Sequence, residues 1–201
     1  MSRFQEVEVK LYITDLAMVA ARLVAAGAER SVPRVFERNI RYEDAEQSLT
    51  DKGIVLRLRQ DMHTKFTYKE PAPSIDDELA TRFEAEVEVS DFEAMDVILK
   101  KLGYQPYVIY EKYRTTYTLD RAEIVLDEMP YGNFVEIEGQ PETIKALIER
   151  LNLGEFPRYK TNYMVLFDRV RTHLKLDVHD LTFENFADVA VPAEAFVAKN
   201  D

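Results

Sequence analysis

A two-residue alternation of charged and apolar side chains constrains the fold of this chain more than any other feature. In residues 4–13, one face carries Glu6, Glu8 and Lys10, and the other carries Val7, Val9, Leu11 and Ile13. Successive residues of a β-strand point to opposite faces of a sheet, so this pattern predicts a strand with one buried face. The same reasoning predicts strands at residues 34–42, 53–60, 64–70, 82–89, 108–117, 122–128 and 133–138.

Helices are predicted by apolar spacing together with end signals. Asp15 is a suitable N-cap for the first helix, and Ser90 with Glu93 forms a capping box at the second. Gly27 and Gly103 follow these two helices, as expected of C-terminal glycines. The predicted helices are residues 16–26, 90–101 and 141–151, the last beginning with a proline, and a weaker candidate spans 161–170. A strand containing Glu-x-Glu precedes each of the first three helices, which indicates structural repetition.

The domain organisation follows from the position of these elements. No linker or low-complexity stretch divides residues 1–170, so we predict one domain there. Residues 171–201 contain no convincing strand and are predicted to form a C-terminal arm or lid. Residues 71–80 carry prolines and acids and are predicted to be a mobile loop.

The direction of the charged strand faces decides the fold class. In an ordinary antiparallel sheet these faces would simply be solvated. Here, however, acids and bases are segregated by strand, and arginines come in pairs such as Arg57 and Arg59. If the helices cover the apolar faces, the charged faces line the inside of a barrel, and eight strands leave room for one elongated ligand. We therefore predict an α+β fold: a closed eight-stranded antiparallel β-barrel (a tunnel) with a charged lumen and helices packed on the outside.

Composition excludes several classes of function. The chain has no cysteine and three histidines, which argues against disulfides, thiolate zinc sites and a cysteine nucleophile. A net charge of −11 argues against nucleic-acid binding. No apolar run is long enough for a bilayer, and the first residues resemble no signal peptide, so we expect a cytoplasmic protein without a membrane partner. A homodimer is compatible with the sequence.

The segment Glu6-x-Glu8-x-Lys10 resembles the signature of the CYTH proteins, also called triphosphate tunnel metalloenzymes. Further charged residues follow in the order and at the spacings of that family: Arg57, Arg59, Lys69, Glu84, Glu86, Glu88, Lys112, Arg114, Asp127, Glu136 and Glu138. The resemblance covers about residues 3–167. Residues 110–117 and 124–139 are most similar to the branch named for class IV adenylate cyclases.

The resemblance implies a site for a triphosphate with a divalent metal, Mg²⁺ or Mn²⁺. By similarity, the metal ligands are Glu6, Glu8, Asp127, Glu136 and Glu138. The phosphates are expected to contact Lys10, Arg57, Arg59, Lys69, Lys112 and Arg114. Catalytic roles fall to Glu8, Lys69 and Asp127, and additional contacts are expected from Arg41, Glu84, Glu86 and Glu88.

The sequence leaves the reaction open. The substrate is a small triphosphate, with ATP, thiamine triphosphate and tripolyphosphate as candidates. A class IV adenylate cyclase-like enzyme would convert ATP to cyclic AMP and pyrophosphate, whereas a triphosphatase would release the terminal phosphate. Two further alternatives are a non-catalytic module that binds polyphosphate or a nucleotide and a structural barrel whose charges pair internally. Because every expected acidic position is filled, an enzyme is favoured over a binding module.

Overall fold

The computed structural model describes residues 3–197, and within them it contains nine strands in one antiparallel sheet. The strands are β1 (Gln5–Tyr12), β2 (Glu29–Glu43), β3 (Val55–Gln60), β4 (Thr64–Pro71), β5 (Ala80–Val89), β6 (Gln105–Leu119), β7 (Ala122–Met129), β8 (Gly132–Glu138) and β9 (Arg158–Tyr159). The helices are α1 (Leu16–Ala25), α2 (Ser48–Asp51), α3 (Phe92–Lys101), α4 (Pro141–Arg150) and α5 (Tyr163–Leu174), followed by a 3₁₀ turn at Ala193–Phe196. The α+β class and the predicted strands and helices are confirmed. In the part of the chain that the structure describes, no helix is both long and apolar enough to span a membrane.

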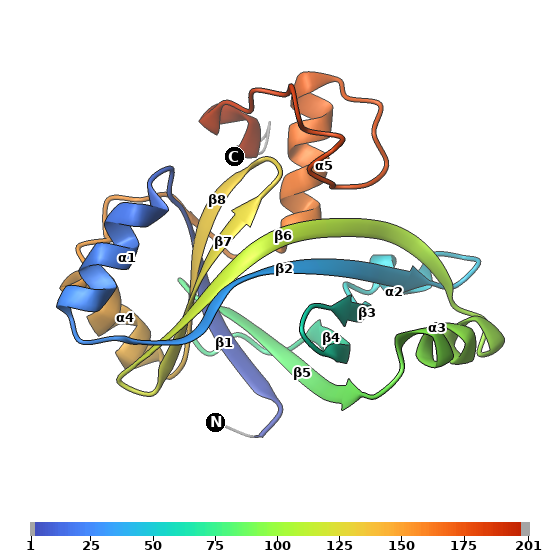
Figure 1. Cartoon of the computed structure of the whole chain (residues 1–201), viewed down its shortest axis with the longest axis horizontal. Coiled ribbons are helices and arrows are strands. Elements are labelled where there is room, and N and C mark those ends of the chain that lie inside the picture. The colour runs from blue at the N-terminus through green and yellow to red at the C-terminus, as the bar shows by residue number, and fades with distance from the viewer. Residues whose placement is uncertain (1–2, 198–201) are drawn as a thin grey trace.

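The order of the strands brings distant parts of the chain together (Figure 1). It runs β5-β4-β3-β2-β6-β7-β8-β1-β9, and β5 also pairs with β1. Each strand from β1 to β8 therefore has a hydrogen-bonded neighbour along both edges. The short strand β9, which the sequence did not predict, pairs with β1 through Arg158 and Tyr159. Strands β2 and β6 are longer than predicted, and they pair antiparallel along most of their length with shifts of register at three places.

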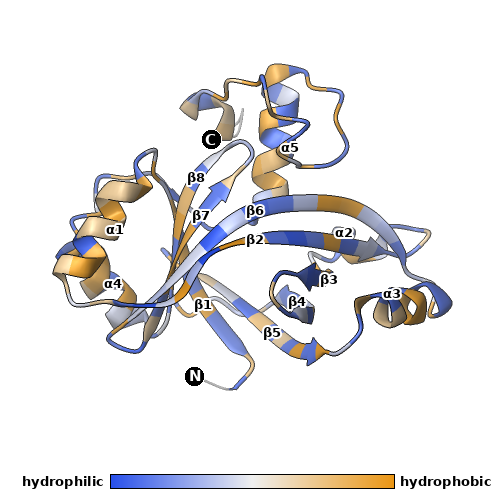
Figure 2. Cartoon of the chain, viewed as in Figure 1, coloured by the Kyte–Doolittle hydropathy of each residue, from blue (hydrophilic) through white to orange (hydrophobic). Residues whose placement is uncertain are grey.

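The apolar strand faces are covered by helices, and this arrangement sends the charged faces inward. Val7, Val9 and Leu11 are at most 1% exposed and lie in one apolar cluster with residues of α1 and α4. On the other side of the molecule, Leu99 of α3 packs against the apolar face of β3. Figure 2 shows α1 and α4 at one end of the sheet and α3 at the other, with hydrophilic and hydrophobic segments visible along strands such as β5 and β6. The predicted placement of helices on the apolar faces is confirmed.

The helix ends follow local chemistry. The Asp15 carboxylate accepts a hydrogen bond from the Met18 amide at 3.0 Å and so caps α1. At α3 the cap is Asp91, whose carboxylate accepts from the Ala94 amide at 2.9 Å. The expected capping box with Ser90 as N-cap is therefore wrong, because the helix begins one residue later. Gly27 and Gly103 follow α1 and α3 with φ of +84° and +99°, a backbone region that favours glycine.

The segment after α5 packs back onto the sheet. Leu181, Phe186 and Phe196 lie in one apolar cluster with Phe134 of β8 and Phe167 of α5. Figure 1 shows this segment and α5 on the same side of the molecule, next to β6, β7 and β8. Helix α5 crosses the predicted domain boundary at residue 170, and the boundary itself stays a prediction.

The loop between β4 and β5, predicted to be mobile, makes ion pairs with its surroundings. Asp76 lies 2.6 Å from Lys145 of α4, and Glu78 lies 3.4 Å from Arg158 of β9. Its mobility stays a prediction.

Candidate functional site

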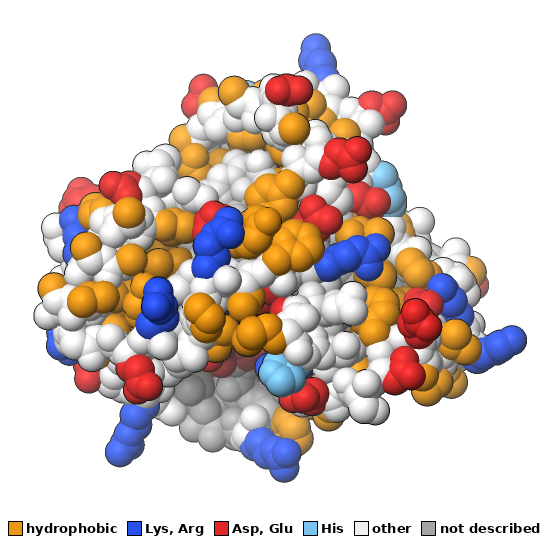
Figure 3. Space-filling model, viewed as in Figure 1, with side chains coloured by type: hydrophobic (Ala, Val, Ile, Leu, Met, Phe, Trp, Pro, Cys, Tyr) orange, Lys and Arg blue, Asp and Glu red, His pale blue; other side chains and the backbone are white. Residues whose placement is uncertain are grey.

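The inward charged faces line a cavity of about 350 Å³. All six predicted phosphate-binding residues line it: Lys10, Arg57, Arg59, Lys69, Lys112 and Arg114. So do four predicted metal ligands (Glu6, Glu8, Glu136 and Glu138) and three of the additional residues (Arg41, Glu84 and Glu86). Asp127 and Glu88 do not line it. On the outer face seen in Figure 3, acidic and basic side chains are interspersed among apolar and neutral ones. On this face, therefore, acidic and basic side chains are not separated from each other as they are in the cavity.

One part of the cavity is acidic because of strand register. Glu8 of β1 stands opposite Glu138 of β8, and Glu138 stands opposite Glu123 of β7. Like charges directly opposite each other on neighbouring strands repel. Burial, together with neighbouring carboxylates that include Glu6, raises the pKa of Glu138 to about 8 and also raises the pKa of Glu8. Glu138 therefore holds a proton at neutral pH in the metal-free protein, and a cation bound beside it would favour the charged form.

The acidic region has the donor chemistry of a magnesium or manganese site. The Oε2 atom of Glu6 is buried and has no hydrogen-bond partner among the described residues. Carboxylate oxygens are the ligands that hard divalent cations prefer. Within residues 3–197, no three acidic or histidine side chains already converge as a ready-made metal cage. Magnesium is commonly held by only one or two carboxylates together with water and substrate phosphate, so these residues fit such an ion.

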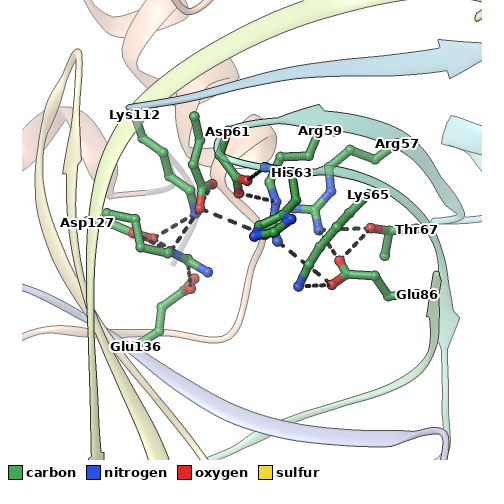
Figure 4. A network of polar contacts seen from close by, with 12 residues as sticks. Arg57, Arg59, Asp61, His63, Lys65, Thr67, Glu86, Lys112, Asp127 and Glu136 are labelled. Carbon is green, nitrogen blue, oxygen red and sulfur yellow. Dashed lines mark hydrogen bonds and ion pairs between the residues drawn. The ribbon is translucent and has the colours of Figure 1, made fainter. Parts of the chain in front are cut away.

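A second part of the cavity is basic. Arg41 of β2 stands opposite Arg57 of β3, so that the two arginines are neighbours on the cavity face of the sheet. Arg57, Arg59 and Lys65 all approach the single carboxylate of Glu86, at 3.3, 3.8 and 2.9 Å (Figure 4). Although burial alone would raise the pKa of Glu86, these cations lower it to about 2. Arg59 also lies 3.1 Å from Asp61 and 3.8 Å from Glu37. With Arg41 beside Arg57, the region still offers several cationic donors to an anion such as a phosphate.

Two lysines lie between the acidic and the basic region. Lys10 Nζ is 2.7 Å from Glu136 and 3.5 Å from Glu8. Burial alone would lower the pKa of Lys10, but Glu136 and Glu8 raise it above the ordinary lysine value. Lys69 Nζ is 2.6 Å from Glu6 and 3.0 Å from Glu84, and the pKa of Lys69 is raised in the same way. Both ammonium groups are therefore charged at neutral pH.

Asp127 is buried behind the side chains that line the cavity. Its side chain is fully buried, and its oxygens accept hydrogen bonds from Lys112 Nζ at 3.0 Å, Arg114 Nε at 2.7 Å and the Tyr163 hydroxyl at 2.8 Å. Figure 4 shows Asp127, Lys112 and Glu136 at one end of this polar network. In this arrangement Asp127 holds two predicted phosphate-binding residues in place. Its predicted part in metal binding and catalysis stays a prediction.

Glu37 is a functional candidate that the sequence analysis did not assign. It is 2% exposed and lies 3.5 Å from Lys112 Nζ and 3.8 Å from Arg59. Burial alone would raise its pKa, but the surrounding lysine and arginines lower it to about 2. Glu37 is therefore ionised at neutral pH, and its negative charge balances part of the positive charge of the neighbouring basic residues. Its position on the same strand face as Arg41 was the signal that could have identified it.

Glu88 lies away from the cavity. Its side chain is 63% exposed and lies 3.1 Å from His63 Nδ1. Glu88 shares a strand face with Glu84 and Glu86, but it stands near the end of β5, beyond the lined part of the sheet. His63 itself is 55% exposed.

A smaller cavity of about 180 Å³ adjoins the charged one. The two share Arg41, Asn162 and Met164 in their linings. The other walls of the smaller cavity combine apolar and aromatic residues, such as Tyr107, Val108, Val165 and Phe167, with the polar Thr50, Asp168, Arg171 and His179. The sequence analysis found no such place, because its residues come from separate parts of the chain, among them β2, α2, β6, α5 and the segment after α5. A charged cavity with a partly apolar annex can hold a ligand with one anionic and one organic part.

The acidic region predicts a pH-dependent stability of the metal-free protein. The pKa of Glu138 is about 8 in the folded chain, whereas an ordinary glutamate has a pKa of 4.5. The folded state therefore binds this proton more tightly than the unfolded state does. The corresponding stabilisation is complete below pH 4.5 and is lost as the pH rises to about 8. We expect the melting temperature in EDTA to decline over this range and the decline to be smaller in Glu138→Gln. Identical pH profiles of the two proteins would contradict this assignment.

Comparison with known proteins shows one family. The family model described as the CYTH domain matches residues 5–153. A Methanocaldococcus jannaschii protein, named provisionally as an adenylate cyclase, is 32% identical over 135 residues, which cover 66% of this chain and 75% of the relative.

Solved structures show the same fold. A Vibrio parahaemolyticus protein, also provisionally named an adenylate cyclase, gives a TM-score of 0.71 at 17% identity, covering 84% of this chain and 99% of that one. The Pyrococcus horikoshii protein PH1819 gives 0.66 at 24% identity, covering 82% and 99%. A Hippeastrum protein, provisionally named an adenylyl cyclase and described as having a dominant triphosphatase activity, gives 0.60 at 18% identity, covering 81% and 95%.

Proposed function

The chain belongs to the CYTH domain family, and we propose that it is a divalent-metal-dependent enzyme that processes a triphosphate inside a closed, charged β-tunnel. The main support for this proposal is that one cavity contains a region in which acidic residues are neighbours and a region in which arginines are neighbours. Glu8, Glu123 and Glu138 face one another in the acidic region, and Arg41 faces Arg57 in the basic region. Each repulsion is relieved by a ligand of opposite charge. A metal–triphosphate complex supplies both ligands at once.

The metal would be held by Glu6, Glu8 and Glu138, with Glu136 and Asp127 as the remaining predicted ligands. When bound, Mg²⁺ or Mn²⁺ supplies positive charge that stabilises the phosphate oxygens as charge develops on them. The phosphates would contact Arg57, Arg59, Lys112 and Arg114 in the basic region. Lys10 and Lys69, which each contact carboxylates of the acidic region, would bind phosphate oxygens between the two regions.

We propose a class IV adenylate cyclase-like reaction with ATP as the substrate. The ribose 3′ oxygen attacks the α-phosphorus, the bond from that phosphorus to the oxygen bridging to the β-phosphate breaks, and pyrophosphate leaves. The 3′ proton must pass to a base. Two features support a substrate with an organic part: the partly apolar cavity beside the charged one and the provisional names of the Methanocaldococcus and Vibrio relatives.

The alternative is a triphosphatase, which transfers the terminal phosphoryl group to water. Its support is the Hippeastrum neighbour with the described triphosphatase activity, although that likeness extends to the fold alone. The charged cavity suits both reactions, because each needs the phosphate charge neutralised and the nucleophile held in line. A non-catalytic polyphosphate or nucleotide-binding module is a weaker candidate.

One assay separates these candidates. The purified protein is incubated with Mg²⁺ or Mn²⁺ and with ATP, thiamine triphosphate, tripolyphosphate or 3′-deoxy-ATP, and cyclic AMP, pyrophosphate and phosphate are measured. We expect cyclic AMP and pyrophosphate in equal amounts from ATP and no cyclic product from 3′-deoxy-ATP. Release of phosphate from 3′-deoxy-ATP at the rate seen with ATP, without cyclic AMP, would establish the triphosphatase. Binding of a triphosphate without formation of any product would support the non-catalytic binding module.

The adjoining cavity gives a second prediction about the substrate. Val165 lines that cavity and is 40% exposed, so a larger side chain can be placed there without disturbing the buried core. We expect Val165→Phe to fill the space and raise the KM for ATP about tenfold, while binding of tripolyphosphate is unchanged. Val165→Ala is the matched control and should leave both nearly unchanged. Equal effects of Val165→Phe on both ligands would show that the cavity does not receive an organic group.

A further inference from the structure

Tyr163 reaches the charged cavity from outside the sheet. It is the first residue of α5 and lies beyond residues 5–153, which the family model matches. Its side chain lines the cavity and is only 8% exposed. The sequence analysis did not single it out, because it treated residues 161–170 only as a weaker helix candidate.

The hydroxyl of Tyr163 contacts the acid that anchors the basic residues. It donates a hydrogen bond to Asp127 Oδ2 at 2.8 Å, and the same oxygen accepts from Lys112 Nζ at 3.0 Å. Arg114 donates to both oxygens of Asp127. Because Asp127 is fully buried, the tyrosine hydroxyl restrains a carboxylate on which two cavity cations depend.

The ring of Tyr163 contacts two of the cavity lysines. Lys10 Nζ lies 4.5 Å from the ring centroid and Lys112 Nζ lies 5.4 Å from it. Such cation–π contacts stabilise an ammonium group most where water is excluded, and both lysines are 2% exposed. One aromatic face therefore fixes where two ammonium groups stand relative to the cavity.

We propose that Tyr163 is a positioning residue of the triphosphate site, which holds Lys10 and Lys112 with its ring and Asp127 with its hydroxyl. This inference rests on the proposed function, because it assigns those lysines to substrate phosphates. It makes α5 a component of the site, although the helix lies outside the sheet. The ligand it serves is the anionic triphosphate with its divalent cation.

A purely structural role would give different behaviour. The main-chain oxygen of Tyr163 accepts a hydrogen bond from the Tyr131 hydroxyl at 2.9 Å, and its ring packs against Phe134 at a centroid distance of 5.3 Å. These two contacts anchor α5 to the sheet. If anchoring were its whole role, loss of the Tyr131 hydroxyl would affect the site as much as loss of the Tyr163 hydroxyl.

The test compares Tyr163→Phe, Tyr163→Leu and the matched control Tyr131→Phe in the full chain. Tripolyphosphate binding with Mg²⁺ is measured by calorimetry, kcat and KM by turnover of the best substrate, and stability by thermal melting. Tyr163→Phe keeps the ring, so we expect binding within about twofold of the wild type and a kcat about tenfold lower. Tyr163→Leu removes the ring as well, and we expect binding to weaken a further tenfold or so. Tyr131→Phe should leave both nearly unchanged.

The possible outcomes distinguish failure of the proposed function, failure of the positioning role and a purely anchoring role. A wild-type protein that neither binds nor turns over triphosphates overturns the proposed function, and with it this inference. An active wild type with an unchanged kcat in Tyr163→Phe overturns only the positioning role of the hydroxyl, and unchanged binding in Tyr163→Leu overturns that of the ring. Equal losses in Tyr163→Phe and Tyr131→Phe assign the residue to anchoring. If Tyr163→Leu melts below the assay temperature, its binding and that of the wild type are compared at a lower temperature at which both are folded.

Discussion

Glu8→Gln is expected to lower turnover of a triphosphate with Mg²⁺ or Mn²⁺ by at least about a hundredfold. Glutamine keeps the shape of the side chain but loses the charge that attracts a hard cation. Glu8 stands opposite Glu138 and lies 3.5 Å from Lys10 Nζ, so in the proposed site its carboxylate would contact both a bound metal and the lysine assigned to phosphate. The measurements are initial rates at saturating substrate and Mn²⁺ affinity by titration.

A matched control separates the local effect from the change in net charge. Glu93 of α3 is exposed and lies outside the cavity, so Glu93→Gln makes the same change of charge at a distant place. We expect Glu93→Gln to have the activity of the wild type. The wild-type protein should also lose activity in EDTA and regain it with excess Mg²⁺. If the Glu8→Gln variant kept full activity in the presence of EDTA, the assignment of Glu8 as a metal ligand would be wrong.

The alternation of residues was sufficient to predict much of the fold. Val7 and Glu8 illustrate why: a strand offers only two faces, and the burial of Val7 against α1 and α4 forces Glu8 to the other side. The same rule placed Arg57 and Lys112 on the inner face before any pairing of strands was known. The existence of strands and the direction of their charged faces are local properties, and a local pattern predicts them.

The parts that the sequence missed depend on register and on distant segments. Glu37 becomes a partner of Lys112 only because β2 pairs with β6 in one register, and that register is set by the whole sheet. Asp127 shares a strand face with the cavity residues Glu123 and Val125 of β7, yet it does not line the cavity, because it is fully buried behind Lys112 and Arg114. Tyr163 comes from a helix whose docking no strand pattern describes.

Several contacts in the site oppose folding. The acids of β1, β7 and β8 face one another, and so do the arginines of β2 and β3. Buried ion pairs such as Lys112 with Asp127 offset part of this cost, but pairing does not remove the like-charge contacts. A chain selected only for stability would place opposite charges at those positions. The arrangement is therefore better explained by a ligand that carries both signs of charge.

Arg57→Ala is expected to weaken the binding of tripolyphosphate with Mg²⁺ by about a hundredfold. The Arg57 guanidinium lines the cavity, donates to the Tyr110 hydroxyl at 3.1 Å and lies 3.3 Å from Glu86. After the substitution, Glu86 keeps Lys65 at 2.9 Å, so its charge stays compensated. Removal of Arg57 also relieves its repulsion with Arg41 across the sheet. We therefore expect the free energy of unfolding of the ligand-free protein to change by no more than about 1 kcal/mol.

Thermal melting with and without tripolyphosphate measures both effects in one experiment. A ligand that binds only the folded state raises the melting temperature in proportion to the logarithm of its concentration over its dissociation constant. The wild type should thus be stabilised by millimolar tripolyphosphate, and Arg57→Ala much less so. Arg30→Ala is the control, because Arg30 is exposed and lies outside the cavity, and it should respond like the wild type. If Arg57→Ala is instead unfolded without ligand, the arginine belongs to a structural network, and the phosphate contact must be assigned to Arg59, Lys112 and Arg114 alone.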